Sequence, residues 1–264
     1  IIIDPMEFRA DDFVATGHYV NNQETKKSRN QEIKSKLKKG KDVNKDQSYF
    51  LAGLTQKQLS LAMFPIGELD KPEVRQIAKE AELANYDRKD SQGICFIGKV
   101  DLKTFLQQKI KPKTGVIEDT DGNRLGEHQG VWYYTIGQRK GLDLPGGPWY
   151  VAEKHIKDNK IIVGRGDDAK LYTNIVQVSE LHWLGQEYKL PLTATAQIRY
   201  RQAPQDVTMA PPLDKEGVKN ILPLDKERLG GVTATFKKPQ KGVASGQILA
   251  IYIKDELVGS GNIL

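Results

Sequence analysis

Cysteine is nearly missing from this sequence of 264 residues, which contains a single one, Cys95. One cysteine cannot form a disulfide within the chain, so a reducing compartment is the default expectation. It also cannot build a zinc site of the cysteine-rich kind, because such a site needs several thiolates around one ion. We therefore expect neither a disulfide framework nor a tightly bound metal.

Long apolar runs are missing too, and no stretch approaches the length that a helix needs to cross a bilayer. The opening residues Ile1, Ile2 and Ile3 are followed at once by Asp4 and Pro5. This run is too short for the apolar region of a signal peptide, so we see no export signal. Hydrophobic residues make up 38% and charged residues 28% of the chain, as in ordinary globular proteins. We expect no membrane partner.

The length is too great for one small core and indicates two or three compact units. The formal net charge is +6 and the sequence pI is about 9.1. A basic balance favours an acidic partner, with nucleic acid first, although many basic proteins bind nothing anionic. Charge alone therefore leaves nucleic-acid binding as a hypothesis.

The N-terminal part of the chain predicts a mixed α/β region. Residues 13–16 have the pattern of a short buried strand, and a strand with no earlier partner implies more sheet upstream. Residues 21–44 are dense in Lys, Asn and Gln, so we expect a solvated, mobile insertion there. Thr55 predicts the capped start of a helix over residues 56–63, and Asp70 predicts the start of another.

After an amphipathic helix predicted around Phe105, the sequence changes beyond Pro112 to short alternating runs. Turn signals such as Asp121-Gly122 separate these runs. Strands at this spacing are typical of a barrel or a sandwich. The predicted strands are residues 116–117, 131–134, 149–151, 161–163, 176–178, 193–200, 232–236 and 248–253.

Cys95 lies in the glycine-bracketed segment SQGICFIG. One interpretation is a buried cysteine that packs as a small hydrophobic residue between Ile94 and Phe96. The other is a nucleophile or sulfur carrier, because Arg88 and Lys89 could lower the pKa of the thiol and the thiolate is the reactive form. The residue types alone leave both interpretations open.

Further segments carry polar side chains in positions suited to ligand binding. His18 follows the first predicted strand, at a strand end of the kind that meets ligands in α/β sheets, or it is a plain turn residue. The Lys-Asp-Gln triplet at residues 45–47 is a candidate contact or a solvated entry loop. Arg199 and Arg201 place two guanidinium groups around the aromatic ring of Tyr200, and such combinations recur in RNA recognition. The glycine-hinged loop at residues 134–142 also combines basic side chains with an aromatic ring and is a candidate anion contact.

Together these segments resemble one family, the tRNA-specific 2-thiouridylases, which thiolate the wobble uridine of certain tRNAs. The matches come in the family's order and span nearly the whole chain, and those at residues 89–98 and 134–142 are long and specific. The matching segments are ATGHY at 15–19, NKDQSYFL at 44–51, FPIGELDKPEVRQIA at 64–78, KDSQGICFIG at 89–98, GEHQG at 126–130, YTIGQRKGL at 134–142, PWYV at 148–151, RYRQ at 199–202 and SGQ at 245–247.

The resemblance implies a fold of the α/β plus β class in three parts. Residues 1–104 would be the C-terminal part, a remnant, of an adenine-nucleotide α-hydrolase-like domain that binds the nucleotide and carries catalysis. Residues 105–171 would form a small central β domain, and residues 172–264 a C-terminal β-barrel. The family's phosphate loop and first cysteine are missing from the sequence. We therefore expect a truncated gene model, a fragment or a degenerate copy.

The resemblance also implies a reaction. ATP, as Mg-ATP, adenylates the C2 oxygen of uridine, and a persulfide sulfur on Cys95 then enters at C2. The implied partners are a tRNA with uridine at the wobble position of its anticodon loop, and a cysteine desulfurase or sulfur-relay protein. No prosthetic group is implied. By residue-by-residue match, Gly17 would contact ATP, and His18, Lys45, Asp46, Gln47, Arg199, Tyr200 and Gln247 would contact tRNA.

Two alternatives stand beside an active tRNA-uridine 2-sulfurtransferase. A catalytically incomplete fragment or paralogue would keep the tRNA-binding surface and lack the chemistry. A stand-alone β-barrel RNA-binding protein would explain the C-terminal half of the chain, but not the segment around Cys95. We expect a cytoplasmic location if the protein is bacterial and a mitochondrial one if it is eukaryotic.

Overall fold

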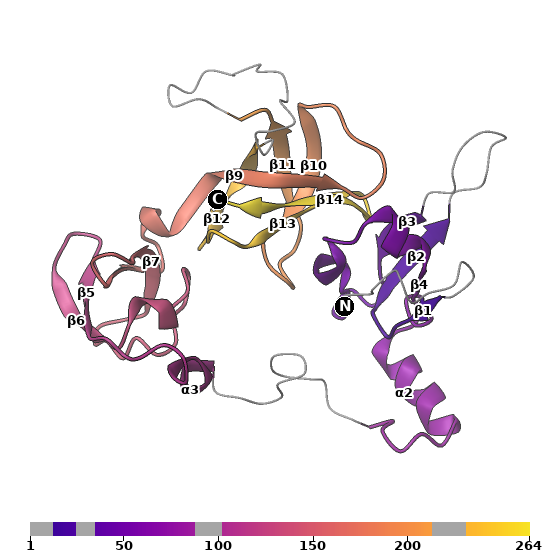
Figure 1. The fold of residues 1–264 in the computed structure, drawn as a ribbon, viewed down its shortest axis with the longest axis horizontal. Coiled ribbons are helices and arrows are strands. Elements are labelled where there is room, and N and C mark those ends of the chain that lie inside the picture. The colour runs from indigo at the N-terminus through magenta and orange to yellow at the C-terminus, as the bar shows by residue number, and fades with distance from the viewer. Residues whose placement is uncertain (1–12, 25–34, 88–101, 213–230) are drawn as a thin grey trace. The chain divides into compact units, whose positions relative to one another are not determined.

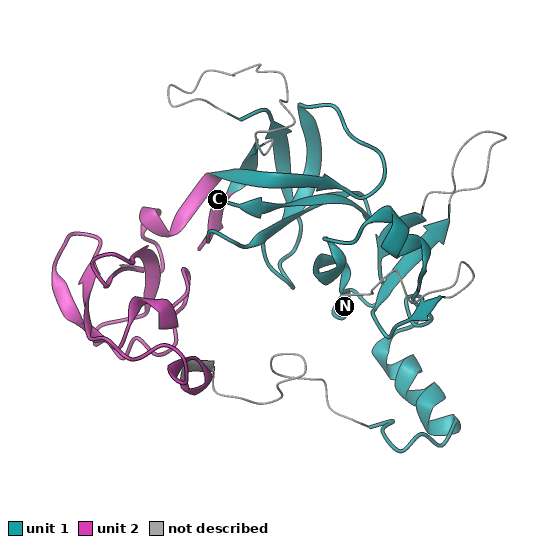
Figure 2. Cartoon of the chain, in the orientation of Figure 1, with its two compact units in different colours: residues 1–87, 175–238, 245–264 teal, residues 88–174, 239–244 magenta. Residues whose placement is uncertain are grey.

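The computed structural model describes residues 13–24, 35–87, 102–212 and 231–264. The chain divides into two compact units, which are coloured separately in Figure 2. The first unit comprises residues 1–87, 175–238 and 245–264, and the second comprises residues 88–174 and 239–244. Among the described helices, none has the length and apolar character needed to span a lipid bilayer.

The main part of the first unit is a closed barrel of six strands (Figure 1). The strand order is β13, β10, β11, β12, β9 and β14, and β14 pairs again with β13 to close the barrel. Val207 and Met209 of β11 and Phe236 of β12 are at most 2% exposed, so alternate side chains fill the interior. The strands are β9 (Tyr172–Trp183), β10 (Leu192–Gln197), β11 (Gln205–Ala210), β12 (Val232–Lys241), β13 (Ile248–Ile253) and β14 (Glu256–Ile263).

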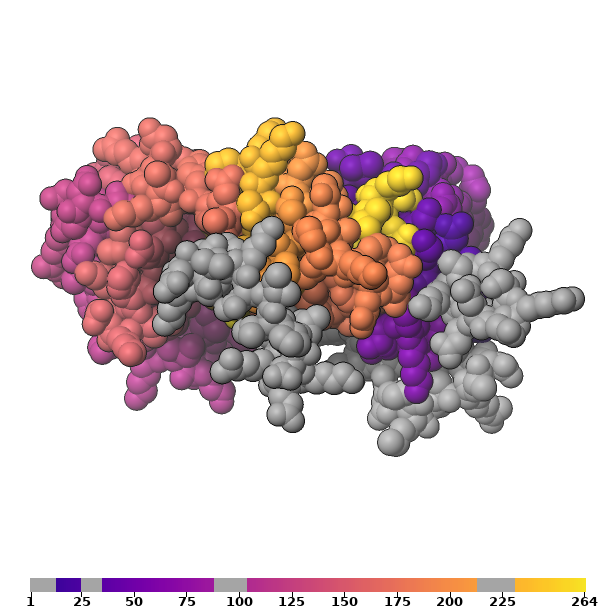
Figure 3. Space-filling view, turned by 90° about the horizontal axis from the view of Figure 1, so that it is seen from above, coloured from indigo at the N-terminus to yellow at the C-terminus, as the bar shows by residue number. Residues whose placement is uncertain are grey.

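A β-hairpin extends the barrel sheet beyond β14. Its strands are β2 (Val20–Glu24) and β3 (Ser35–Lys39). The prediction of a mobile insertion over residues 21–44 is therefore wrong for these strands. Leu37 is fully buried where β3 pairs with β14, and the Lys36 ammonium lies 2.7 Å from Glu256, so charged residues flank one buried side chain. The contact between the C-terminal strands, in yellow, and the N-terminal residues, in indigo, is visible in Figure 3.

A mainly helical segment follows the hairpin and shares a core with the barrel. Leu59 of this segment and Tyr252 of β13 belong to one buried cluster. Thr55 caps the first helix with a capping box, as predicted, and Asp70 does the same for the second. The first helix is shorter than predicted. The elements are η1 (Ser48–Leu51), α1 (Gln56–Ser60), β4 (Ala62–Met63) and α2 (Lys71–Glu80).

The strand predicted at residues 13–16 is present but short. It is β1 (Val14–Ala15), and its partner among the described residues is β4, which pairs with it in parallel and comes later in the chain. Phe13 is 57% exposed, so the strand is not buried as predicted. Thr16, Gly17 and His18 follow at the carboxyl end of β1, where a parallel sheet presents its turns to ligands.

The second unit contains a four-stranded sheet in the order β6, β5, β8, β7. The strand predicted at residues 131–134 is wrong, because Val131–Tyr133 is a 3-10 helix, η2. Gly130 turns the chain there with a φ of 140°, and the Tyr133 N–H donates to its carbonyl at 3.1 Å. The elements are α3 (Leu102–Gln107), β5 (Gly115–Asp119), β6 (Arg124–His128), η2, β7 (Trp149–His155), β8 (Lys160–Arg165) and η3 (Ala169–Leu171).

Candidate functional site

The turn after β1 carries Gly17 and His18. Thr16 Oγ1 lies 2.6 Å from Nδ1 of His18, which orients the imidazole. Burial lowers the pKa of His18, so the ring is neutral near pH 7. Among the described residues, Nε2 of His18 has no hydrogen-bond partner, which leaves it available to a ligand. A Cβ added to Gly17 would meet only Ile66, at 3.9 Å, so packing against the described residues does not require glycine here.

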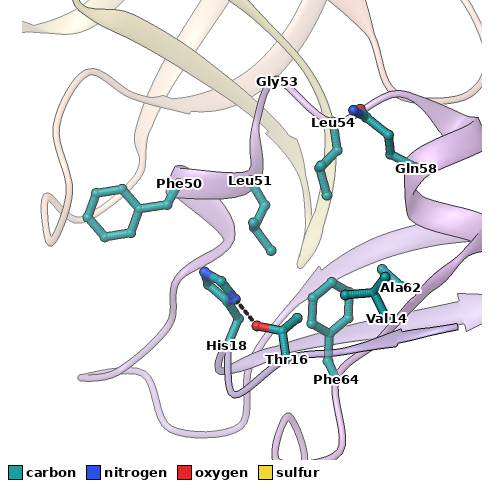
Figure 4. A pocket seen from close by; sticks show the side chains of 10 residues that line it. All are labelled: Val14, Thr16, His18, Phe50, Leu51, Gly53, Leu54, Gln58, Ala62 and Phe64. Carbon is teal, nitrogen blue, oxygen red and sulfur yellow. Dashed lines mark hydrogen bonds between the residues drawn. The ribbon is translucent and has the colours of Figure 1, made fainter. Parts of the chain in front are cut away.

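A cavity of about 240 Å³ lies beside His18 (Figure 4). His18 and Thr16 face it from one side, and Leu51 and Leu54 reach into it from the other. Among the described residues that line it there is no lysine or arginine, so it suits an uncharged planar group better than a phosphate. The lining residues are Val14, Thr16, His18, Phe50, Leu51, Gly53, Leu54, Gln58, Ala62 and Phe64.

The triplet at residues 45–47 holds the turn after β1 in place. Gln47 Oε1 accepts a hydrogen bond from the Tyr19 N–H at 3.1 Å, and the Gln47 N–H donates to the Tyr19 carbonyl at 3.2 Å. Asp46 accepts from the N–H of Ser48 at 3.2 Å and from its hydroxyl at 2.9 Å. Because Tyr19 directly follows His18, the triplet and the histidine form one hydrogen-bonded unit.

A buried chain of hydroxyl groups fixes this unit to the barrel. The single proton of the Ser48 hydroxyl goes to Asp46, and the same hydroxyl lies 3.1 Å from that of Tyr252 on β13. Tyr252 must therefore be the donor, and burial raises its pKa, which keeps the phenol protonated. The Lys39 ammonium lies over the Tyr252 ring, 4.4 Å from its centre.

The hydroxyl of Tyr49 on η1 joins two distant segments of the barrel. It lies 2.9 Å from the carbonyl of Ile248 and 3.2 Å from that of Ile198. Gln247 precedes Ile248, and Arg199 follows Ile198, so one hydroxyl brings both predicted contact segments next to η1. Burial raises the pKa of Tyr49, so the hydroxyl keeps its proton and remains a donor.

Tyr200 stacks on an aromatic side chain of η1. Its ring centre is 4.3 Å from that of Phe50, at an interplanar angle of 40°, and the Arg201 guanidinium carbon is 5.3 Å from the Tyr200 ring centre. The strand predicted through Tyr200 is too long, because β10 ends at Gln197. Arg199 and Tyr200 lie in the turn that follows, where their side chains are partly exposed.

The described residues that the resemblance assigns to the site lie in the first unit, around η1. The candidate loop at residues 134–142 lies in the second unit, and Cys95 lies outside the described residues. The structure adds Tyr49 and Phe50, which the sequence prediction missed, and it places Arg201 beside the Tyr200 ring. The only signal for Tyr49 and Phe50 was their place in the segment NKDQSYFL. The residues brought together are Gly17, His18, Lys45, Asp46, Gln47, Arg199, Tyr200 and Gln247.

Three family models match the chain in succession. Residues 4–99 match the tRNA methyl transferase HUP domain, residues 103–165 the tRNA methyl transferase PRC-barrel domain, and residues 173–263 the aminomethyltransferase beta-barrel domain. These matches confirm the expected fold of three parts, and the described structure shows the last of them as a closed barrel.

The chain is also similar to curated proteins named tRNA-specific 2-thiouridylase MnmA. It is 41% identical over 258 residues to that of Pseudoalteromonas translucida, with 95% of this chain and 65% of the relative covered. It is 42% identical over 254 residues to that of Shouchella clausii, with 95% and 64% covered. For Idiomarina loihiensis the identity is 40% over 268 residues, with 97% and 67% covered. The chain thus spans about two thirds of the length of these relatives.

Proposed function

This chain belongs to the family of tRNA-specific 2-thiouridylases, and we propose that it binds tRNA and takes part in the 2-thiolation of the wobble uridine. Four segments that are distant in sequence meet around η1, and this meeting carries the proposal. They contribute His18, the triplet at residues 45–47, the Arg199-Tyr200 pair and Gln247. Together they offer an imidazole, a guanidinium, an aromatic ring and an amide on one surface.

Each of these groups suits a different part of an RNA loop. A guanidinium such as that of Arg199 pairs with a phosphate, and the ring of Tyr200 stacks on a base. The neutral His18 ring presents Nε2 toward ligands and can hydrogen-bond the edge of a base. An anticodon loop is a fitting ligand, because its unpaired bases can turn out of the stack and enter a pocket.

The proposed reaction has three steps, of which the first two join sulfur to the base. ATP transfers its adenylyl group to the C2 oxygen of uridine and releases pyrophosphate, which turns that oxygen into part of a good leaving group. The terminal sulfur of a persulfide on Cys95 then attacks C2, and AMP leaves. The cavity beside His18 is largely apolar and suits the uridine ring. Gly17 would lie against ATP, but the triphosphate must be held elsewhere, because the described cavity offers no cation.

Completing the transfer requires a second thiol. The sulfur now bound to C2 is still joined to the sulfur of Cys95, and a thiolate that attacks Cys95 would release the thiouridine and leave a disulfide. The sequence contains no cysteine besides Cys95. The second thiol therefore lies outside these 264 residues.

The binding half of the proposal is tested by titrating a tRNA transcript with wobble uridine at several salt concentrations. The logarithm of the association constant should fall linearly with the logarithm of the salt concentration, because phosphate contacts release counterions. Arg199→Ala should make this slope shallower by about one contact. Lys157→Ala, at an exposed lysine of the second unit, is the matched control and should leave the slope unchanged. Binding that does not depend on salt would refute an RNA interface.

The chemical half is tested by incubating the protein with a cysteine desulfurase and its relay proteins. Mass spectrometry should find one added sulfur on Cys95, and Cys95→Ser should lose this adduct while tRNA binding stays at the wild-type level. If the wild-type protein takes up no sulfur and still binds tRNA, the catalytically incomplete tRNA-binding protein is the correct description.

A further inference from the structure

Phe50 is an exposed aromatic side chain held in a fixed position within this interface. It is 57% exposed, yet it stacks on Tyr200 and meets the ring of Tyr49 edge-on, with centres 6.1 Å apart and an interplanar angle of 74°. A ring held by two aromatic neighbours loses little conformational freedom when a ligand covers its exposed face. Phe50 is therefore preorganised for contact with a further flat group.

The surroundings of Phe50 indicate what that group is. Phe50 lines the cavity that His18 faces. Arg201, which is exposed and has no ion-pair partner among the described residues, lies beside the stacked ring of Tyr200. Aromatic rings next to a guanidinium are the combination that binds single-stranded nucleic acid. A protein partner would instead need an interface of about 1,600 Å², far more than the face of one ring.

We propose that the exposed face of Phe50 is a stacking platform for one unpaired base of the RNA, next to the base that enters the cavity beside His18. Arg201 contributes a contact to the phosphate backbone at the same place. This inference rests on the proposed function and adds two residues, Phe50 and Arg201, to the interface. Because every base has a flat aromatic face, the platform favours a loop over a duplex and does not select a sequence.

The test compares an anticodon stem–loop RNA with a blunt RNA duplex that has the sequence of the stem. Loss of one stacked base costs about tenfold or more in affinity. Phe50→Ala should therefore weaken binding of the stem–loop by about tenfold and leave binding of the duplex unchanged, whereas Phe50→Trp should keep the wild-type affinity. Tyr86→Ala is the matched control, because Tyr86 is an aromatic residue of the same unit that is 42% exposed and lies outside this interface.

Two readouts separate stacking from a general loosening of the interface. The salt slope should stay constant in Phe50→Ala, which removes no charge, and become shallower by about 0.7 in Arg201→Ala. A 2-aminopurine placed in the loop should lose fluorescence when it stacks on the wild-type protein, and this quenching should be absent in Phe50→Ala. Phe50→Leu keeps an apolar contact with Tyr200 but has no aromatic face. It should show the same loss of stem–loop affinity and of quenching as predicted for Phe50→Ala, and it replaces that variant in the test if the alanine protein unfolds.

Equal losses for stem–loop and duplex, or full quenching with the leucine variant, would overturn the platform. A Phe50→Ala protein that binds the stem–loop as tightly as wild type would also overturn it, and would leave the proposed function standing. Failure of the wild-type protein to bind either RNA would overturn the proposed function, and the platform with it.

Discussion

The hydroxyl of Tyr49 can be removed by Tyr49→Phe with the ring left in place. The variant keeps the ring contact with Phe50 and loses only the hydrogen bonds to the carbonyls of Ile198 and Ile248. These carbonyls belong to the segments that carry Arg199 and Gln247. We expect both segments to open more often, without a change in the fold of the barrel.

The expected loss in the free energy of opening follows from the two hydrogen bonds of the Tyr49 hydroxyl. One hydrogen bond adds a net of about 0.5–1.5 kcal/mol to stability, and a buried carbonyl left without a partner costs more than an exposed one. The single proton of Tyr49 serves two carbonyls, and Ile198 is only 1% exposed. We therefore expect a loss of about 1–2 kcal/mol in the free energy of opening, which corresponds to about 5- to 30-fold more frequent opening.

Amide hydrogen exchange measures this opening directly. Protection at residues 198–202 and 247–249 should fall by the factor just given, while the amides of β11 should exchange as in the wild type. The control is Tyr134→Phe, which removes a hydroxyl that donates to the Gly141 carbonyl at 3.3 Å in the second unit. It should alter exchange near Gly141 alone. Unchanged protection at both barrel segments in Tyr49→Phe would refute the role given to this hydroxyl.

Two further predictions concern stability. Leu37→Ala should lower the free energy of unfolding by about 2–5 kcal/mol, because Leu37 is fully buried, whereas Lys38→Ala next to it should cost at most about 1 kcal/mol. Urea unfolding measures the free energy of unfolding of both variants. If Leu37→Ala lost as little stability as Lys38→Ala, the pairing of β3 with β14 would be contradicted. Burial also lowers the pKa of His128 below its usual 6.5, so the unfolded state takes up the proton first as the pH falls. The stability that the neutral His128 contributes should be complete above about pH 6.5 and be lost as the pH falls below it. Thermal unfolding measured across this range should therefore depend less on pH in His128→Gln than in the wild type. Glutamine is chosen because its amide oxygen can still accept a hydrogen bond from the Gly130 N–H.

Local chemistry made the helix starts predictable. Thr55 with Gln58, and Asp70 with Glu73, form capping boxes from residues three apart, and no distant partner is needed for them. The barrel strands β12 and β13 were also predictable from local pattern, since β13 is a continuous apolar run and β12 begins with apolar residues in alternation.

The missed features depend on partners far away in the sequence. The sequence of β3 has the composition of a charged loop, because lysines surround Leu37. Only the pairing with β14 shows that the Leu37 side chain is buried. Tyr49 gains its importance from carbonyls at Ile198 and Ile248, which no local pattern connects to it. Residues 131–134 have the composition of a strand, but the backbone turn at Gly130 overrides that preference.

The residues predicted to contact tRNA divide into two groups by what their side chains already bind. Asp46 accepts hydrogen bonds from Ser48, and Gln47 accepts one from the backbone of Tyr19, so in the proposed interface both act first by holding the loop and the turn at His18 in position. His18 differs, because its Nε2 has no partner among the described residues. A surface built in this way keeps its polar scaffold partly buried and leaves an imidazole and flat aromatic rings for the proposed ligand. The proposed preference for unpaired bases would therefore come from rigidity acquired in folding, since the groups proposed to meet the RNA are positioned before it arrives.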